Sequence, residues 1–331
     1  MPNHHNSLTF AGYVEKATAD ALGARSVVQK EVFDRFTFRE SVRSNTVANF
    51  FSRPVSFGEV FPRFLGDVTE VRTSFDDDVW LGWTALYAYT VAIDGAMDRD
   101  EKIVPQHLLT LTALFEYSLY KLRSAVRQQR DHKRFHRYLK EALDCQYRSS
   151  GQHFGPEVTY ETARGKNRLL SAYSLAYACR YRLNKGLLVQ IADALLLPIQ
   201  LCDDLVDVYE DYVQRVPTLL TQHFLKDQCD RARILTKHEL YEGLISNGDL
   251  TKHIRQICSG LRSAQNVLLS GKDLSRNVEI LGVIDMFVAT VTELERYLSE
   301  IRLEFQTYSV PKRHAIIDHV ESVIRAQAPS S

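Results

Sequence analysis

Apolar side chains recur at intervals of three and four residues along much of this chain. Six long stretches show the pattern, and each predicts an amphipathic or buried α-helix. They cover residues 76–97, 106–126, 159–183, 187–212, 253–269 and 277–305. No comparable stretch alternates apolar and polar residues at a period of two, so the pattern does not predict strands. We therefore expect an all-α fold of about ten or more helices.

The stretches between these helices predict a single domain over residues 1–331. The clearest breaks, at residues 149–156 and 246–249, are short and polar, as connections between helices are. The chain has no internal repeat and no low-complexity linker, and its 15 glycines and 9 prolines exclude a collagenous or turn-dense chain. We expect residues 1–25 to be irregular or loosely packed, and residues 307–331 to form a C-terminal helix.

Charge and cysteine usage narrow the classes of function. The chain carries 41 basic and 41 acidic side chains, so no overall field attracts it to nucleic acid or to an anionic membrane. The apolar run at residues 194–199 is too short to span a bilayer, and we expect no membrane span. Five widely spaced cysteines without a C-x-x-C pair indicate reduced thiols. With no signal peptide recognisable at the N-terminus, we expect a cytoplasmic protein.

Carboxylates at the end of the fourth apolar stretch suggest a metal site. Asp203, Asp207 and Asp211 stand at i, i+4 and i+8, on a face that drifts by about 40° per step, whereas Asp204 and Glu210 lie off that line. Like charges at this spacing repel, and carboxylates on an apolar helix are unfavourable unless a cation compensates. Hard oxygen ligands of this kind suit Mg²⁺.

A second acidic pair, Asp94 and Asp98, ends the first apolar stretch. The same helical face continues back through Thr90, Tyr87, Trp83 and Trp80. Aromatic faces stabilise cations, so acids above an aromatic stripe fit an enzyme that generates a carbocation. A single D-x-x-x-D is typical of a solvated helix surface, and an aromatic stripe is typical of ordinary core. Two acidic clusters, each ending a strongly apolar helix, favour the metal-site hypothesis.

These residues resemble the motifs of the microbial class I terpene synthases. DGAMD at residues 94–98 resembles their first aspartate-rich motif, and DDLVDVYED at residues 203–211 resembles their second metal motif, N-D-x-x-S-x-x-x-E. Arg296 and Tyr297 match the RY pair near the end of such enzymes. The segment that ends in Arg164 resembles the one with their diphosphate-sensing arginine.

The resemblance covers roughly residues 75–305 and implies a class I terpenoid synthase fold, an α-helical barrel or bundle around a central apolar cavity. It implies a Mg²⁺-dependent ionisation of a prenyl diphosphate, with three Mg²⁺ ions for which Mn²⁺ can substitute. The implied substrate is farnesyl diphosphate, cyclised to a sesquiterpene hydrocarbon such as humulene with release of diphosphate. A monomer or a homodimer would carry this out.

The resemblance also implies roles for individual residues. The metal ligands are Asp94, Asp98, Asp203, Asp207 and Asp211. The diphosphate contacts are Arg164, Lys166, Arg168, Arg296 and Tyr297, and the walls of the substrate pocket are Trp80, Trp83, Tyr87 and Thr90. The central catalytic group is Asp94, Asp203, Arg164, Arg296 and Tyr297.

Departures from the family pattern keep two alternatives open. Gly95 stands where the first motif usually has a second aspartate, so ligation there depends on Asp94 more than on Asp98. DDLVD also satisfies the D-D-x-x-D motif of chain-elongating prenyl diphosphate synthases, although those enzymes usually carry two such motifs. The basic stretch at residues 121–140 fits a helical nucleic-acid-binding or scaffold protein instead. The neutral total charge weighs against that second alternative.

Overall fold

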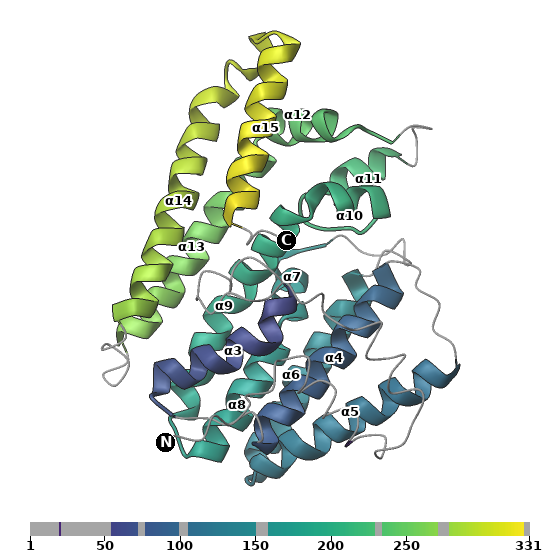
Figure 1. Cartoon of the computed structure of the whole chain (residues 1–331), viewed down its shortest axis with the longest axis vertical. Helices are drawn as coiled ribbons and strands as arrows, with labels where there is room; N and C mark the ends of the chain where they lie inside the picture. The colour runs from purple at the N-terminus through teal and green to yellow at the C-terminus, as the bar shows by residue number, and fades with distance from the viewer. Residues whose placement is uncertain are drawn as a thin grey trace, which may run out of the picture.

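The computed structural model describes residues 20, 54–71, 77–98, 105–149, 158–228, 234–270 and 278–327. Within these residues the regular elements are thirteen α-helices and one short 3₁₀-helix, with no strand, which confirms the all-α class (Figure 1). The helices are α3 (Pro54–Thr69), α4 (Asp78–Asp98), α5 (Pro105–Ala125), α6 (Gln129–Ser149), α7 (Tyr160–Lys166), α8 (Leu169–Tyr181), α9 (Lys185–Val206), α10 (Val208–Gln214), α11 (Gln222–Gln228), α12 (Lys237–Asn247), α13 (Asp249–Ser270), α14 (Val278–Arg302), the 3₁₀-helix Phe305–Thr307 and α15 (Val310–Gln327). Apart from Asp20, the N-terminal segment 1–25 lies outside the described residues.

Two of the predicted helices are broken in the structure. The stretch 159–183 divides at Asn167 into α7 and α8, and the stretch 187–212 divides at Asp207 into α9 and α10. At the second break the Asp207 N–H still donates to the Asp203 carbonyl at 3.1 Å, and the Asp211 N–H donates to the Asp207 carbonyl at 2.8 Å. The chain therefore bends without leaving its helical course, and the acidic residues stay on consecutive turns.

The direction of the helices alternates from α4 to α9. Residues 126–128 join α5 to α6 and residues 182–184 join α8 to α9, and connections this short force each pair to reverse direction. Helix α4 packs along α5, and α8 packs along α9. Figure 1 shows α4, α6 and α9 rising in the same direction. The carboxyl ends of α4 and α9 therefore lie toward one end of this bundle and their amino ends toward the other.

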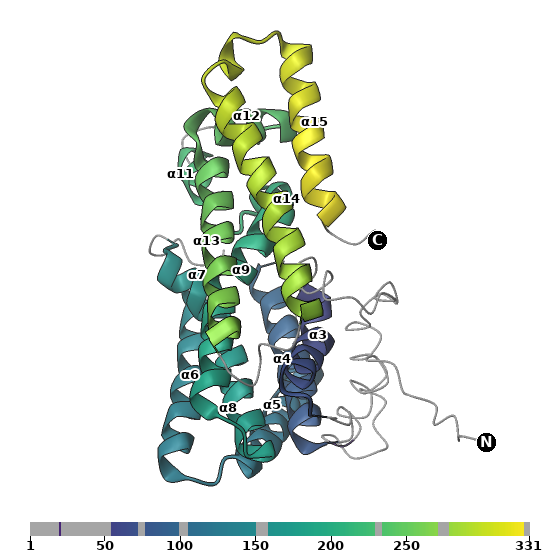
Figure 2. The same ribbon diagram turned by 90° about the vertical axis from the view of Figure 1, so that its left-hand side faces the viewer.

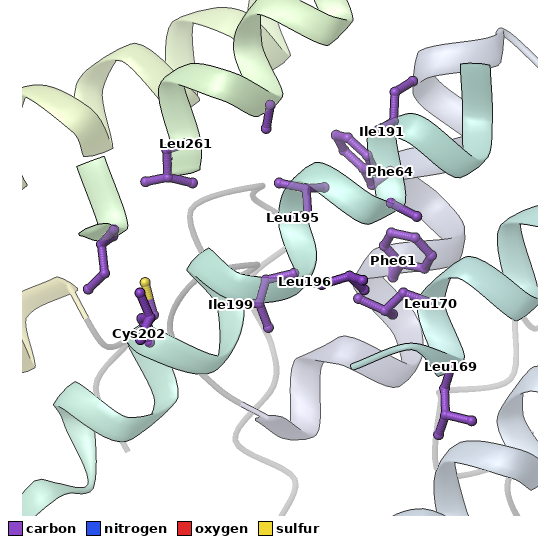
Figure 3. Packing of buried hydrophobic residues seen from close by; sticks show 14 of the residues in the cluster. Phe61, Phe64, Leu169, Leu170, Ile191, Leu195, Leu196, Ile199, Cys202 and Leu261 are labelled. Carbon is purple, nitrogen blue, oxygen red and sulfur yellow. The ribbon is translucent and has the colours of Figure 1, made fainter. Parts of the chain in front are cut away.

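Helices α8 and α9 form the centre of the core. Every residue of α8 from Leu169 to Ala178 is buried, although the sequence analysis did not single out this segment as central. Helix α9 packs against α8, α7 and α13, and α13 leads to α14 and α15 beside it (Figure 2). Figure 3 shows side chains of α9 such as Leu195 and Leu196 lying between Leu261 of α13 and Phe61 of α3. Contacts on several sides explain why α9 is apolar nearly all round.

Among the described helices, α9 is the one long and apolar enough to cross a membrane. In its most apolar window 61% of the residues are buried inside the structure. Buried core helices meet the same criteria of length and composition, so this is weak evidence and gives no clear membrane span.

Helices α9 and α13 approach closely where Pro198 meets Gly260. Pro198 lies inside α9, where it has no N–H to donate to the preceding turn. A Cβ atom built on Gly260 would lie 2.4 Å from Cγ and 3.0 Å from Cδ of that ring. Only glycine fits this crossing without a shift of one of the two helices.

We predict that Gly260→Ala destabilises the protein, whereas Gly282→Ala, at an exposed position of α14, stabilises it. Alanine is favoured over glycine in a helix by about 1 kcal/mol. Nothing lies within 4 Å of the Cβ position at Gly282. At Gly260 this gain is offset by overpacking of about 1–3 kcal/mol. Urea unfolding of both variants measures the difference, and an equal gain in stability at the two positions would contradict the close approach.

Candidate functional site

Four carboxylates gather where α9 ends and α10 begins, and we call Asp203, Asp204, Asp207 and Asp211 the aspartate cluster. Asp204 is buried, and the other three are half-buried. Three of them occupy the carboxyl end of α9, where the helix dipole is itself negative and so disfavours further negative charge. This position adds to the repulsion felt by Asp203 and Asp204, whereas Asp207 and Asp211 also stand at the start of α10, where the dipole is positive.

A chain of side-chain amides orients two of these carboxylates. Gln200 Nε2 donates to Asp204 Oδ1 at 2.9 Å and to Asp203 Oδ2 at 3.3 Å. Asn167, at the end of α7, donates through Nδ2 to Gln200 Oε1 at 3.2 Å and to the Leu196 carbonyl at 3.1 Å. Because Asn167 engages the oxygen of Gln200, the NH₂ group of Gln200 is turned toward the carboxylates.

Burial raises the pKa of Asp204. The positive charges of His253 and Lys166 and the hydrogen bond from Gln200 oppose that rise. His253 is buried on α13, and its Nε2 lies 2.7 Å from the Leu201 carbonyl. Since a carbonyl only accepts, this nitrogen carries a proton and ties α13 to the end of α9. Burial also lowers the pKa of His253, and the charge of Asp204 counteracts this effect.

Asp211 is repelled by the other three carboxylates of the cluster. Burial raises its pKa well above the usual range, and the charges of Asp204, Asp203 and Asp207 raise it further. Lys166 on α7 is the cation that opposes this shift. Burial and like charge thus disfavour the ionised forms of Asp204 and Asp211, and a bound cation would favour them.

Two of the three predicted diphosphate contacts on α7 and α8 lie in different settings. Lys166 is half-buried and close enough for its charge to act on Asp204 and Asp211, whereas Arg164 is exposed on the same short helix. Helix α7 packs closely against α6 at Gly165. A Cβ atom at this position would lie 2.2 Å from Cys145 Sγ. This packing positions Lys166 against the cluster.

The third, Arg168, is engaged elsewhere. Its guanidinium pairs with Asp193 at 2.5 Å and with Glu141 at 2.9 Å, and it lies over the Tyr138 ring at 5.5 Å from the centroid. These contacts join α6 to α9. In this conformation the side chain is a structural link between helices.

The predicted RY pair lies on the outer part of α14. Arg296 is exposed and pairs with Glu293 and Glu300 of its own helix, both at 2.7 Å. Tyr297 is half-buried and meets the edge of the His319 ring at 5.5 Å between centroids. No hydrogen bond or ion pair in the described part of the chain connects either side chain to the aspartate cluster.

The predicted pocket residues belong to the packed core. Trp80, Trp83 and Tyr87 are buried, and the Trp83 ring lies 4.9 Å from Tyr173 and 6.1 Å from Phe61 between centroids. Thr90 is half-buried, and its hydroxyl donates to the Leu86 carbonyl at 2.9 Å. Asp94 and Asp98 lie in the last turns of α4, and their side chains are outside the described residues.

The described residues near the cluster leave little open space and form no prearranged metal site. An apolar cavity of about 30 Å³ lies between α9, α13, α14 and α15, lined by Cys202, Leu205 and Leu294 among others. This is room for about one water molecule. Within the described residues, no group of three or more His, Cys, Asp or Glu side chains is arranged to hold a metal ion.

Sequence reasoning left Asp204 outside the ligand set, gave Asn167 no role, and did not identify Gln200 or His253. The structure places all four at the cluster. One signal was available, because Gln200 and Asp204 form a polar i, i+4 pair within an otherwise apolar helix. The contacts from α7 and α13 depend on tertiary packing and leave no local pattern.

Comparisons of the chain with protein-family models, with curated proteins and with solved structures gave no match. The function proposed below therefore depends on the chemistry of the chain's own residues, above all on the aspartate cluster.

We predict that Asp211→Asn stabilises the metal-free protein at pH 7 by roughly 1 kcal/mol, since it removes three like-charge interactions of about 0.2–0.5 kcal/mol each. Because the pKa of Asp211 is raised in the folded state, its ionisation destabilises the fold at neutral pH. The penalty disappears as the pH falls below the unfolded pKa of about 3.9. Thermal unfolding in metal-free buffer at pH 7 and near pH 4 measures the effect.

Glu210→Gln is the matched control, because this exposed neighbour bonds to Gln214 and is not one of the charges that shift Asp211. A gain for Asp211→Asn that persists unchanged near pH 4, or a loss of stability at pH 7, would contradict the described electrostatics.

Proposed function

We propose that this chain is a Mg²⁺-dependent enzyme that ionises a prenyl diphosphate and cyclises the resulting allylic cation to a hydrocarbon, with farnesyl diphosphate as the expected substrate. The observation that carries the proposal is the aspartate cluster at the end of an apolar core helix. Burial and mutual repulsion destabilise its carboxylates, and a bound cation would stabilise them. The resemblance of residues 94–98 and 203–211 to terpene synthase motifs gives that cation its role.

The donors of the cluster fit Mg²⁺ in chemical type. This ion is usually held by one or two carboxylates together with waters and substrate phosphate oxygens, so it does not require a prebuilt group of three protein ligands. Asp203 and Asp207 are one turn apart and half-buried, which makes them the described carboxylates best placed to hold it. When bound, the metal would neutralise the departing diphosphate.

Basic side chains on α7 would hold the diphosphate. Lys166 already acts on the cluster, and Arg164 offers a planar fork suited to phosphate oxygens from the same helix. The amide chain from Asn167 through Gln200 keeps Asp203 and Asp204 turned toward this side.

Helix α4 would contribute the second acidic motif and part of the apolar interior. Its carboxyl end, which carries Asp94 and Asp98, lies toward the same end of the bundle as that of α9 (Figure 1). Its aromatic rings exclude water and can stabilise a cation. A prenyl chain needs a site of roughly 300 Å³ or more. The proposal therefore requires core helices to rearrange when substrate binds.

Incubation with C10, C15 and C20 prenyl diphosphates, with and without Mg²⁺, tests this function. We expect a cyclic hydrocarbon and released diphosphate from the C15 substrate, and only with Mg²⁺, as measured by gas chromatography–mass spectrometry and a diphosphate assay. A longer prenyl diphosphate formed on addition of isopentenyl diphosphate would identify a chain-elongating synthase instead. Neither hydrocarbon nor diphosphate in any reaction would reject the proposal.

Asp203→Asn tests the site within the same assay. It keeps the shape of the side chain but removes a charge, and we expect turnover to fall by at least about 100-fold, as when one group that stabilises developing charge is lost. Asp94→Asn should act in the same direction. Glu210→Gln should keep full activity, and circular dichroism should be the same for all three. Full activity of Asp203→Asn would place the metal elsewhere.

A further inference from the structure

A polar recess lies at the opposite end of α4 and α9 from the aspartate cluster. It is formed by the α5–α6 turn, the α8–α9 turn and the start of α4, and encloses about 440 Å³, a size typical of small-molecule sites. We call it the basic recess. Its polar lining consists of Ser124, Arg127, Gln128, Arg180, Arg182 and Lys185, together with the carboxylate of Asp78.

The charges around the basic recess do not cancel. Asp78 lines it, Asp77 and Asp131 contact its cations Arg180 and Lys185, and each of these three carboxylates is paired with a cation. The pairs are Asp77 with Arg180 at 3.2 Å, Asp78 with Lys121 at 2.6 Å and Asp131 with Lys185 at 2.6 Å. Arg127 and Arg182 have no acidic partner among the described residues. Within the described ranges, two guanidinium charges of the recess therefore have no paired carboxylate.

Helix dipoles add to this positive potential. Helices α4, α6 and α9 each contain more than 20 residues, and all three begin at the basic recess, at Asp78, Gln129 and Lys185. Amino ends of helices carry partial positive charge, although Asp77 caps the Val79 N–H of α4 and Asn184 caps the Leu187 N–H of α9. The recess therefore combines three such ends with these two arginines.

The backbone at Arg182 is held in a conformation that favours glycine. Its φ is 59°, in the left-handed region, where it ends α8. Arg215 ends α10 in nearly the same conformation, with φ 60°, and does not line the recess. Glycine at either position removes the guanidinium and relieves the backbone, so this pair of arginines provides a matched test.

We propose that the basic recess binds a small phosphate dianion, inorganic phosphate or a phosphomonoester, between Arg127 and Arg182. A phosphomonoester carries close to two negative charges at pH 7, which matches these two guanidinium charges, and arginine forks bind phosphate oxygens in pairs. Val79, Ala125 and Leu183 provide an apolar wall for a short organic group. Arg127 belongs to the basic stretch at residues 121–140, and the concave shape favours a small anion over an extended nucleic acid.

The test is calorimetric titration of the full chain with inorganic phosphate and with glycerol 3-phosphate, in Mg²⁺-free buffer at low salt. We expect saturable binding at one site that weakens as salt is added. The double variant Arg127→Gln/Arg182→Gly should bind at least about tenfold more weakly, because it loses two charge-assisted contacts. Arg215→Gly should bind as the unchanged protein does.

Circular dichroism checks that the variants are folded. If the double variant is not folded, Arg127→Gln alone replaces it in the titration, because Arg127 lies in a loop. No saturable binding below about 10 mM phosphate, or equal binding by the folded double variant, would overturn the proposal. Displacement of phosphate by single-stranded RNA at lower concentration would also overturn it, in favour of nucleic acid. Binding of the chain to phosphatidic acid vesicles is measured by sedimentation. If free phosphate reverses this binding, the result would support the same site, with a lipid as the source of the phosphate. The catalytic proposal is not involved, since no Mg²⁺ or prenyl substrate is present.

Discussion

Repulsion among carboxylates at the end of a core helix is the constraint on which the proposed chemistry depends. Helix α9 is held by apolar contacts on several sides, so its carboxyl end cannot turn Asp204 out into water. Asp203, Asp207 and Asp211 lie on consecutive turns beside it, and Asp203 shares with it the end of α9, where the dipole is also negative. An arrangement that disfavours folding in this way is expected where a bound cation offsets it, and such local conflict is typical of functional sites.

The alternating direction of the helices separates charge along the bundle. Helices α4 and α9 begin at the basic recess and end toward the aspartate cluster (Figure 1). Their dipoles therefore add positive potential at one end and negative potential at the other. A chain with zero formal net charge can in this way present a cation site and an anion site at opposite ends of the same two helices.

Helical periodicity was sufficient to predict the all-α class and most of the long helices. The apolar residues that a helix buries recur at regular spacing within its own sequence, so neighbouring residues alone reveal them. The breaks at Asn167 and Asp207 were not predictable in this way, since the apolar pattern continues across them. The acidic stripe was predictable from spacing, whereas the surroundings of Asp204 include His253 of α13 and, through Gln200, Asn167 of α7. For Arg296, the partners Glu293 and Glu300 stand at i−3 and i+4, so its surface pairing was already visible in the sequence.

The most direct test of the account is whether the aspartate cluster binds a divalent cation. Titration of the purified chain with Mn²⁺, followed by electron paramagnetic resonance with and without diphosphate, counts the bound ions. We expect saturable binding that diphosphate strengthens and that Asp203→Asn or Asp207→Asn weakens, while Glu210→Gln leaves it unchanged. Absence of bound Mn²⁺ in the presence of diphosphate, or equal binding by the Asp203→Asn and Asp207→Asn variants, would contradict the central claim.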